Sequence, residues 1–483
     1  QMGISTAALI AGRLREHGVR YVFGIPGGAS IPYIDSLRNE GIGFILTSHE
    51  SAAAVMADVT ARITGVTGVC HATYGPGATN LLTGVGGAFL DRSPVIALTS
   101  VMGERWAGRT AQMNIDHLSL FRPVTKASYR LTPGNAGMIM QEAFDIANSE
   151  YPGPVHIGWP DDIAFAGASE DTRISENPGL PANPDVSGLL SRSGSPVIAI
   201  GLTAARLGIG KNLKTFLDSH PVPVVVTPMA KDVISTDHPC FAGVLFHALS
   251  DRLKPLFEKT DLVIGLGYDP VEYNYESWMP DVPLLHFGTI ASDLPGGDST
   301  CFVSSPGEWF SHLGKLSTSP ATVAMASEIN SSIRKSFARS YNGFSPVEAL
   351  NILRNTLPCD AIITADVGSH LHLLGQQWDI PPEGRLIITN GWSSMGFGLP
   401  AALAAALNCP GKTVVCVTGD GGFSMSAGEM MTARRYGLKI IVVVLADGEL
   451  NLIRLKQDKR GVSPAGVNLY KNSMFGGDTF LGT

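Results

Sequence analysis

The sequence predicts an α/β protein made of doubly wound parallel β-sheets that are covered by helices on both faces. Short apolar runs alternate with segments of helical pattern along the chain, and this alternation is typical of β-α-β units. The runs are almost continuously apolar, as expected for strands that are buried on both faces. With 483 residues, 44% of them apolar, 55 glycines and 31 prolines, the chain suits about three domains rich in turns.

Predicted strands in the first third of the chain lie at residues 21–25, 43–47, 68–73, 94–98 and 154–158. Polar or glycine-rich segments follow the first three of them, and open parallel sheets bind ligands at the carboxyl ends of their strands. Glu50 follows the second strand and opens a helix. It either complements the helix dipole or faces a ligand. His49 and His71 likewise have either a structural or a catalytic role.

Three further apolar runs predict a parallel sheet in the middle of the chain, at residues 196–201, 223–227 and 261–267. The last of these ends in Gly265-Leu266-Gly267. This is a fragment of a dinucleotide-binding signature, but the third glycine is missing and no clear helix follows.

The end of the chain holds a candidate metal site. Residues 413–418 and 440–445 are predicted buried strands, and residues 424–436 are the predicted helix between them. Gly419-Asp420-Gly421-Gly422 follows the first strand, and Asp447 stands just past the second. Magnesium prefers oxygen ligands, and a glycine-rich turn at a helix start suits a phosphate group. These residues therefore predict a magnesium–diphosphate site.

Composition argues against several other classes of protein. The net charge is −7 and there is no basic run, so nucleic acid is not an expected partner. The longest uncharged apolar stretch, residues 395–409, is shorter than the ~20 residues of a membrane span and predicts a core helix. The six cysteines are scattered without metal-binding spacing, which favours a reducing, cytoplasmic setting.

Five motifs follow one another along the chain: His49-Glu50-Ser51-Ala52-Ala53-Ala54, Gly75-Pro76-Gly77-Ala78-Thr79-Asn80-Leu81, Phe121-Arg122-Pro123-Val124-Thr125-Lys126, Met395-Gly396-Phe397-Gly398-Leu399-Pro400-Ala401-Ala402 and Gly419-Asp420-Gly421-Gly422-Phe423. Together they resemble the thiamine-diphosphate enzymes of the acetolactate (acetohydroxyacid) synthase and pyruvate oxidase type. The resemblance covers nearly all of the chain and implies a pyrimidine-binding domain at residues 1–165, a central domain at 185–320 and a diphosphate-binding domain at 340–483. We expect this last domain to continue beyond Thr483. The resemblance also implies a homodimer or a dimer of dimers, with active sites at the subunit interface.

The resemblance assigns roles to single residues. Glu50 would hydrogen-bond the aminopyrimidine ring of thiamine diphosphate, and Met395 would hold the cofactor in its bent shape. Mg²⁺ would be bound by Asp420, Asp447 and the backbone carbonyl of Glu449. Gln112 is the second catalytic candidate, although it stands one residue further from Asp116 than the family pattern requires. The remaining implied cofactor contacts are Pro26, Thr73, Gly75, Asn80, Ser369, His370, Gly391, Ser393, Gly419, Gly421 and Gly422.

Two features separate branches of this family. The first is Asp447, which stands at a position where asparagine is commoner in the family but where the FAD-free, catabolic acetolactate synthases also have Asp. The second is the segment 268–273, which resembles the corresponding segment of the same catabolic enzymes. The resemblance therefore permits FAD binding in the central domain, but these two features favour an enzyme without FAD. Arg454 and Lys456 either bind an acidic substrate group or form a solvated charged face.

The resemblance implies an enzyme that decarboxylates a pyruvate-like 2-oxo acid and joins the resulting carbanion equivalent to a second carbonyl compound, as acetolactate synthases do. The departure around Gln112 keeps a second reading open, in which the chain is a related lyase or transferase. That reading includes enzymes like carboxyethylarginine synthase, sulfoacetaldehyde acyltransferase or a diketone hydrolase. A third reading is a nucleotide-binding paralogue without catalysis, which the presence of Glu50, Asp420 and Asp447 disfavours.

Overall fold

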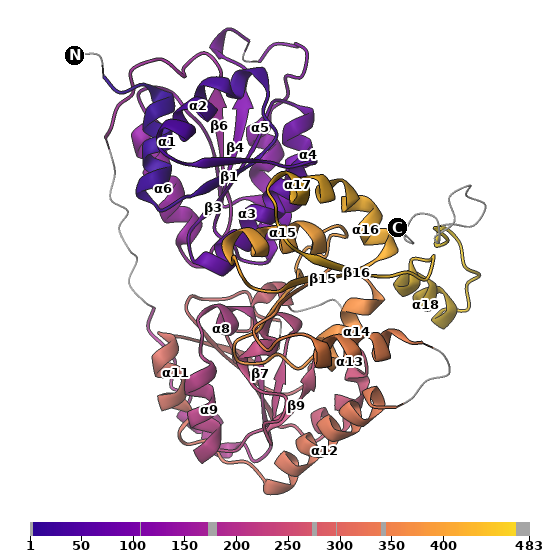
Figure 1. Cartoon of the computed structure of the whole chain (residues 1–483). Helices are drawn as coiled ribbons and strands as arrows, with labels where there is room; N and C mark the ends of the chain where they lie inside the picture. Colours follow the sequence, from indigo (N-terminus) through magenta and orange to yellow (C-terminus); the bar gives the residue numbers. More distant parts are fainter. Residues whose placement is uncertain are drawn as a thin grey trace. The chain divides into compact units, whose positions relative to one another are not determined.

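A computed structural model describes residues 3–106, 108–171, 181–272, 278–295, 297–339 and 344–469 (Figure 1). Tyr273, the last residue of the segment 268–273, and residues 470–483 lie outside these described residues. The chain divides into two compact units. One comprises Gln1–Asn177, Ile362–Val367 and Ile387–Thr483, and the other comprises Pro178–Ala361 and Gly368–Leu386.

The first sheet has six parallel strands in the order β2-β1-β3-β4-β6-β5. Its strands are β1 (Tyr21–Gly24), β2 (Gly43–Leu46), β3 (Gly68–Ala72), β4 (Val95–Val101), β5 (Ala127–Arg130) and β6 (Val155–Pro160). Its helices are α1 (Thr6–Glu16), α2 (Ile31–Asn39), α3 (Glu50–Thr64), α4 (Pro76–Leu90), α5 (His117–Phe121) and α6 (Ala136–Asn148). Apolar side chains of α1, α2 and α6 form one core, and those of α3 and α4 belong to another, so helices cover both faces of the sheet (Figure 1).

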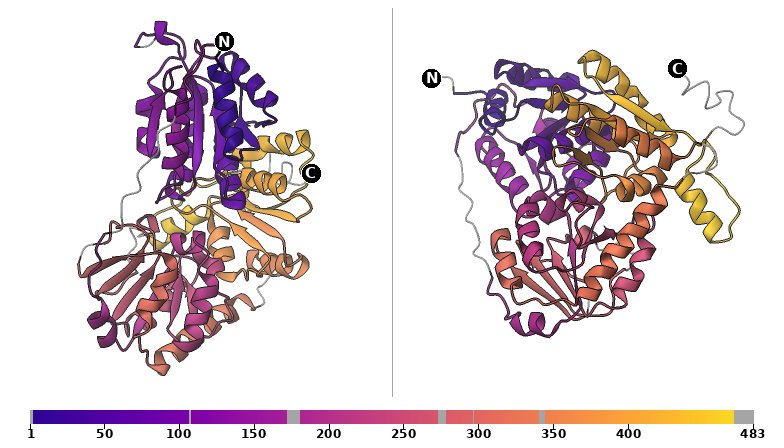
Figure 2. Two further views of the ribbon diagram at one scale, coloured as in Figure 1. Left: turned by 90° about the vertical axis from the view of Figure 1, so that its left-hand side faces the viewer. Right: turned by 60° about the horizontal axis from the view of Figure 1, so that its bottom comes forward.

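The second sheet makes up the core of the other unit and has the strand order β12-β11-β10-β7-β8-β9. Its strands are β7 (Pro196–Ile200), β8 (Val224–Val226), β9 (Phe241–Val244), β10 (Leu262–Leu266), β11 (Leu284–Gly288) and β12 (Ser299–Val303). Its helices are α7 (Ser187–Arg192), α8 (Leu202–Arg206), α9 (Gly210–Ser219), α10 (Lys254–Phe257), α11 (Pro306–Leu313) and α12 (Pro320–Phe337). Figure 2 shows helices on both faces of this sheet as well, and all its strand pairs are parallel.

The third sheet has four strands in the order β14-β13-β15-β16. They are β13 (Ile362–Ala365), β14 (Arg385–Ile387), β15 (Val414–Gly419) and β16 (Ile441–Leu445). The helices of this part are α13 (Pro346–Thr356), α14 (Ser369–Gln377), α15 (Gly398–Asn408), α16 (Asp420–Ser426), α17 (Met430–Arg435) and α18 (Asn451–Lys459). The predicted core helix is present as α15, and its first eight residues are buried. It packs against α3 in a shared core.

Two details of the predicted diphosphate region are wrong. The helix expected at 424–436 is two short helices, α16 and α17, joined by a 3₁₀ turn at Ala427–Glu429. The strand expected to be buried at 440–445 forms as β16, but its side chains are half-buried or exposed. The reason is its position, because β16 is the edge strand of the described sheet. Within the described residues, no helix is long and apolar enough to cross a membrane.

Candidate active site

Glu50 lies at the carboxyl edge of the first sheet and is buried. The side-chain amide of Asn80 donates a hydrogen bond of 3.0 Å to its Oε2 atom. A Cβ atom at Gly77 would stand 3.4 Å from Glu50 Oε1 and 3.2 Å from Thr73 Cγ2. The loops after β2 and β3 therefore bring Glu50, Thr73 and Asn80 together around a glycine. The resemblance implies a cofactor contact for each of these three residues, and that role stays a prediction.

The turn before Glu50 is held by a second carboxylate. Glu429 accepts hydrogen bonds from the backbone N–H groups of Ser48, at 3.0 and 3.2 Å, and His49, at 2.9 Å. The His49 side chain then caps α3 by accepting from the backbone N–H of Ser51. His49 is thus a capping residue in the structure, and Glu50 is fixed at the first position of α3.

His71 also has a structural role. It is fully buried, and burial lowers its pKa to about 3. The neutral ring contacts the Leu98 carbonyl through Nδ1, at 3.2 Å, and the Ser30 hydroxyl through Nε2, at 2.7 Å. Ser30 Oγ in turn accepts from the backbone N–H of Gly27. His71 therefore fixes the turn after β1, which begins with the predicted contact residue Pro26.

The loop that carries Gln112 packs against the Gly75 turn. Gly75 has φ +50°, and a Cβ atom there would stand 2.7 Å from the carbonyl oxygen of Met113. His117 accepts a 3.2 Å hydrogen bond from the Gly75 N–H. Gln112 itself is exposed. The structure therefore brings the backbone of this loop to the predicted pyrimidine side, while the catalytic role of Gln112 stays a prediction.

The predicted metal ligands lie at the carboxyl ends of β15 and β16. Asp420 is buried, and its Oδ2 atom accepts a 2.8 Å hydrogen bond from the Gly448 N–H. Asp447 is exposed at the surface. Its pKa is nevertheless raised, mainly by partial loss of contact with water and further by the negative charge of Asp420. The hydrogen bond from the Glu449 N–H acts in the opposite direction and lowers the pKa. The two neighbouring carboxylates are a suitable donor set for Mg²⁺, which prefers oxygen ligands.

The predicted ligand set contains only two acidic side chains, because Glu449 contributes its carbonyl. Accordingly, the described residues hold no group of three or more His, Cys, Asp or Glu side chains that could bind a metal. The Glu449 carboxylate is paired with Arg454 at 2.9 and 3.0 Å, and Arg454 also binds Asp458. Arg454 is therefore engaged in ion pairs, whereas Lys456 is exposed.

Met395 lies over the glycine-rich turn. A Cβ atom at Gly421 would stand 3.1 Å from its methyl carbon, so a larger residue at this position would require Met395 to shift. Asp366, at the end of β13, accepts hydrogen bonds of 2.9 Å from the N–H groups of both Gly396 and Gly398. Its carboxylate also occupies the space beside Gly422, where a Cβ atom would approach to 2.7 Å. Asp366 thus joins the two motifs, and burial raises its pKa.

Sequence reasoning missed Asp366. The signal was present, because an acid directly follows an apolar run that forms a strand, the same pattern that identified Asp420. Of the other predicted contacts, Gly391 and Ser393 belong to the segment before Met395 in the first unit. Ser369 and His370 open α14 in the second unit.

The central sheet carries a carboxyl group, that of Glu272, where a dinucleotide would bind. The strand order reverses between β7 and β10, and ligands of doubly wound sheets bind at such a switch point. Here Glu272 Oε2 accepts from the N–H groups of Leu202, at 2.8 Å, and Asp269, at 3.1 Å, which follow β7 and β10. A Cβ atom at Gly201 would stand 2.4 Å from the same oxygen. The donors that would hold the diphosphate of FAD are therefore taken by Glu272, and the residues do not fit that group.

Glu272 makes stability depend on pH. Burial raises its pKa from 4.5 to about 8, so between these values the folded chain retains a proton that the unfolded chain releases. Stability therefore falls as pH rises through this window, by up to ~1.4 kcal/mol per pH unit. Glu272→Gln is expected to remove this slope in urea unfolding of the central domain, whereas the exposed Glu258→Gln retains it. An unchanged slope in Glu272→Gln would contradict the assignment.

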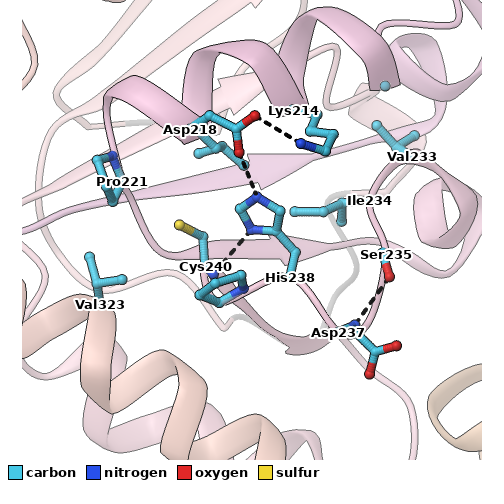
Figure 3. A pocket seen from close by; sticks show the side chains of 13 residues that line it. Lys214, Asp218, Pro221, Val233, Ile234, Ser235, Asp237, His238, Cys240 and Val323 are labelled. Atoms are coloured by element: carbon cyan, nitrogen blue, oxygen red, sulfur yellow. Dashed lines mark hydrogen bonds and ion pairs between the residues drawn. The ribbon is translucent and has the colours of Figure 1, made fainter.

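A hollow of about 710 Å³ opens in the second unit, and Figure 3 shows its lining. It lies beside Pro221 and Cys240, which precede β8 and β9. Its polar groups pair with one another: Lys214 binds Asp218 at 2.8 Å, and His238 accepts from the Cys240 N–H at 3.2 Å. The hollow follows α9 from Gly210 to Asp218 and is bounded on its other side by residues between Val233 and Cys240.

Comparison with known proteins agrees with this geometry. The N-terminal TPP binding domain of thiamine pyrophosphate enzymes matches residues 4–120, the central domain of these enzymes matches 185–295, and their C-terminal TPP binding domain matches 366–473. Acetolactate synthase isozyme 2 large subunit from Escherichia coli is 31% identical over 91% of this chain and 82% of its own length. The chain belongs to the thiamine pyrophosphate enzymes of the acetolactate synthase type.

Other relatives extend the same comparison. Acetolactate synthase from Arthrospira platensis is 31% identical over 93% of this chain and 83% of that protein. A probable acetolactate synthase large subunit from Methanocaldococcus jannaschii is 29% identical over 92% of this chain and 81% of that protein. The family, the fold of three parallel-sheet domains and the class of thiamine-diphosphate-dependent carboligase are thus confirmed.

Proposed function

We propose that this enzyme binds thiamine diphosphate with Mg²⁺, decarboxylates a pyruvate-like 2-oxo acid and transfers the remaining carbon unit to a second carbonyl compound. The observation that carries the proposal is that acidic side chains and other predicted cofactor contacts lie together at the carboxyl edges of two sheets. Glu50 lies against Asn80 and Gly77 at one sheet edge. Asp420 and Asp447 stand together at the carboxyl edge of another.

The cofactor supplies the nucleophile and the electron sink when it is bound. The protein's own residues supply position and proton transfer. Glu50 would share a proton with the aminopyrimidine ring, and Asn80 holds the carboxylate in place for this. Asp420, Asp447 and the Glu449 carbonyl would hold Mg²⁺, which binds the diphosphate through oxygen. Met395 would keep the cofactor bent.

The misfit at Glu272 supports an enzyme without FAD, as in the catabolic acetolactate synthases that the segment 268–273 resembles. We further propose a homodimer or a dimer of dimers, in which the pyrimidine and diphosphate sides of each centre come from different subunits. The six free cysteines suit the reducing cytosol proposed as its location.

The product identifies the reaction. Purified enzyme with thiamine diphosphate, Mg²⁺ and pyruvate alone is expected to form acetolactate, as measured by mass spectrometry. If pyruvate is consumed only when a different acceptor is added, the second candidate applies, which is a related lyase or transferase. The observation that favours this second candidate is the loop around Gln112, in which Met113 has φ +62° and packs on the Gly75 turn. No turnover of any 2-oxo acid would overturn both candidates.

A further inference from the structure

We propose that Arg62, acting through Asp58 and Asp91, positions the loop of residues 388–396 that carries Met395. We call this segment the Met395 loop. The inference rests on the proposed function, because it concerns the wall of the proposed cofactor site. Arg62, Asp58 and Asp91 are positioning residues in this proposal and touch no substrate themselves.

Arg62 is held in one orientation by two elements of the first domain. Its Nε and Nη2 atoms donate to the two oxygens of Asp58, each at 2.7 Å, one turn earlier on α3. Nε also donates to Ser93 Oγ at 3.2 Å. Asp58 is buried, so this bidentate pair is shielded from water. Such a fork fixes both the plane and the position of a guanidinium group.

The same guanidinium reaches the Met395 loop. Nη1 donates a 2.6 Å hydrogen bond to the carbonyl of Ile388, and Nη2 donates at 3.0 Å to Asp91, the residue that caps the end of α4. The ring of Phe397, just after the loop, lies under the guanidinium at 5.7 Å. Arg62 therefore joins α3 and the end of α4 to both ends of the loop.

Asp91 continues the connection into the loop backbone. Its Oδ1 atom accepts from the N–H groups of Asn390, at 3.2 Å, and Gly391, at 2.8 Å. Its Oδ2 atom accepts from the Thr389 hydroxyl at 2.6 Å as well as from Arg62. Asp91 is buried, and three successive loop residues are thus bound to one carboxylate.

Packing leaves the loop little freedom to shift. A Cβ atom at Gly86 would stand 2.8 Å from the Trp392 ring, and one at Gly391 would stand 2.6 Å from Leu90 Cβ. The loop also contains Ser393 at φ +53°, a conformation that is strained for a residue with a Cβ atom and persists when the surroundings impose it. The network of Arg62 and Asp91 supplies such surroundings at the start of the loop.

The consequence for the site follows from the position of Met395. Its methyl group lies against Gly421, so that a Cβ atom there would approach it to 3.1 Å. A loop that loses its anchor lets Met395 move relative to the glycine-rich turn, and the proposed cofactor wall loses its shape. The effect should therefore fall on binding of thiamine diphosphate rather than on binding of the 2-oxo acid.

The test compares Arg62→Lys with Arg38→Lys, which alters an exposed ion pair with Asp35 in the same domain. Lysine retains the charge but lacks the fork that bridges Asp58, Asp91 and Ile388. Arg62→Lys is expected to raise the Kd for thiamine diphosphate, measured by calorimetry with excess Mg²⁺, and its KM by about tenfold, equivalent to ~1.4 kcal/mol. The KM for the 2-oxo acid should stay near the wild-type value, as all these constants should in Arg38→Lys.

Thr389→Val is the milder second variant, because it removes one hydrogen bond to Asp91 and leaves the ion pair intact. It should raise the Kd for thiamine diphosphate by a smaller factor while the protein remains folded. If folded Arg62→Lys and Thr389→Val both bind thiamine diphosphate as tightly as the wild type, the positioning role is wrong. Failure of the wild type itself to bind thiamine diphosphate would instead overturn the proposed function.

Discussion

Glu50→Gln is expected to lower kcat by about 10²–10⁴-fold, the usual contribution of a general acid–base group. Glutamine retains the length of the side chain and an oxygen that can accept from Asn80, so the fold and the affinity for thiamine diphosphate should change little. What it loses is the carboxylate that would exchange a proton with the aminopyrimidine ring. Hydrogen–deuterium exchange at the cofactor C2 atom, followed by NMR, measures this step directly.

The matched control is Glu16→Gln, which removes an exposed carboxylate from α1 of the same domain. It should exchange at the wild-type rate. If Glu50→Gln also exchanges at that rate, Glu50 does not act on the pyrimidine, and the burial of this carboxylate beside Asn80 and Gly77 has only a structural meaning. A loss of cofactor binding, rather than of exchange, would assign Glu50 to affinity instead of proton transfer.

The parts of the fold that the sequence predicted are those in which local pattern and tertiary environment agree. Buried strands such as β3, β7 and β15 are continuous apolar runs, and they were all predicted. Strands β5, β9, β11, β12, β13 and β14 were not predicted. Strands β5 and β14 are short, carry polar or charged residues and lie at sheet edges, whereas β9, β11 and β13 are short, buried and mostly apolar runs whose signal was present in the sequence but was missed. A strand like β5 or β14 is selected by its neighbours rather than by its own composition.

The candidate site shows the same division. Glu50 and Asp420 were identified because they directly follow apolar runs, where parallel sheets place their ligands. Arg62 lies on α3, and Asp91 caps the end of α4. Nothing in their local sequence shows that both contact a loop about 300 residues later. Glu272 belongs to the segment 268–273, and its position at the switch point depends on the strand order, which the sequence does not show.

Asp420→Ala is expected to abolish cofactor retention at ordinary Mg²⁺ concentrations. The change removes one of two carboxylates at the proposed metal site and also leaves the half-buried Gly448 N–H without its acceptor, which costs at most about 1–3 kcal/mol. Mutation of residues that only orient a metal ligand lowers metal affinity about 10–100-fold, so loss of a direct ligand should lower Mg²⁺ affinity by at least about 100-fold. The measurement is the Mg²⁺ concentration that half-saturates thiamine diphosphate binding.

Two further variants separate the metal from the hydrogen bond. Asp420→Asn retains an oxygen for Gly448 but loses the charge, whereas Asp458→Asn removes a nearby exposed carboxylate on α18 that pairs with Arg454. If Mg²⁺ is bound here, Asp420→Asn should need about as high a Mg²⁺ concentration for half-saturation as Asp420→Ala does. Asp458→Asn should need no more Mg²⁺ than the wild type. Asp447→Asn should be milder than either Asp420 variant, because asparagine also offers an oxygen and is the commoner residue at this position in the family. Wild-type Mg²⁺ dependence in Asp420→Asn would mean that Asp420 serves only to hold Gly448, and the metal would have to be placed elsewhere.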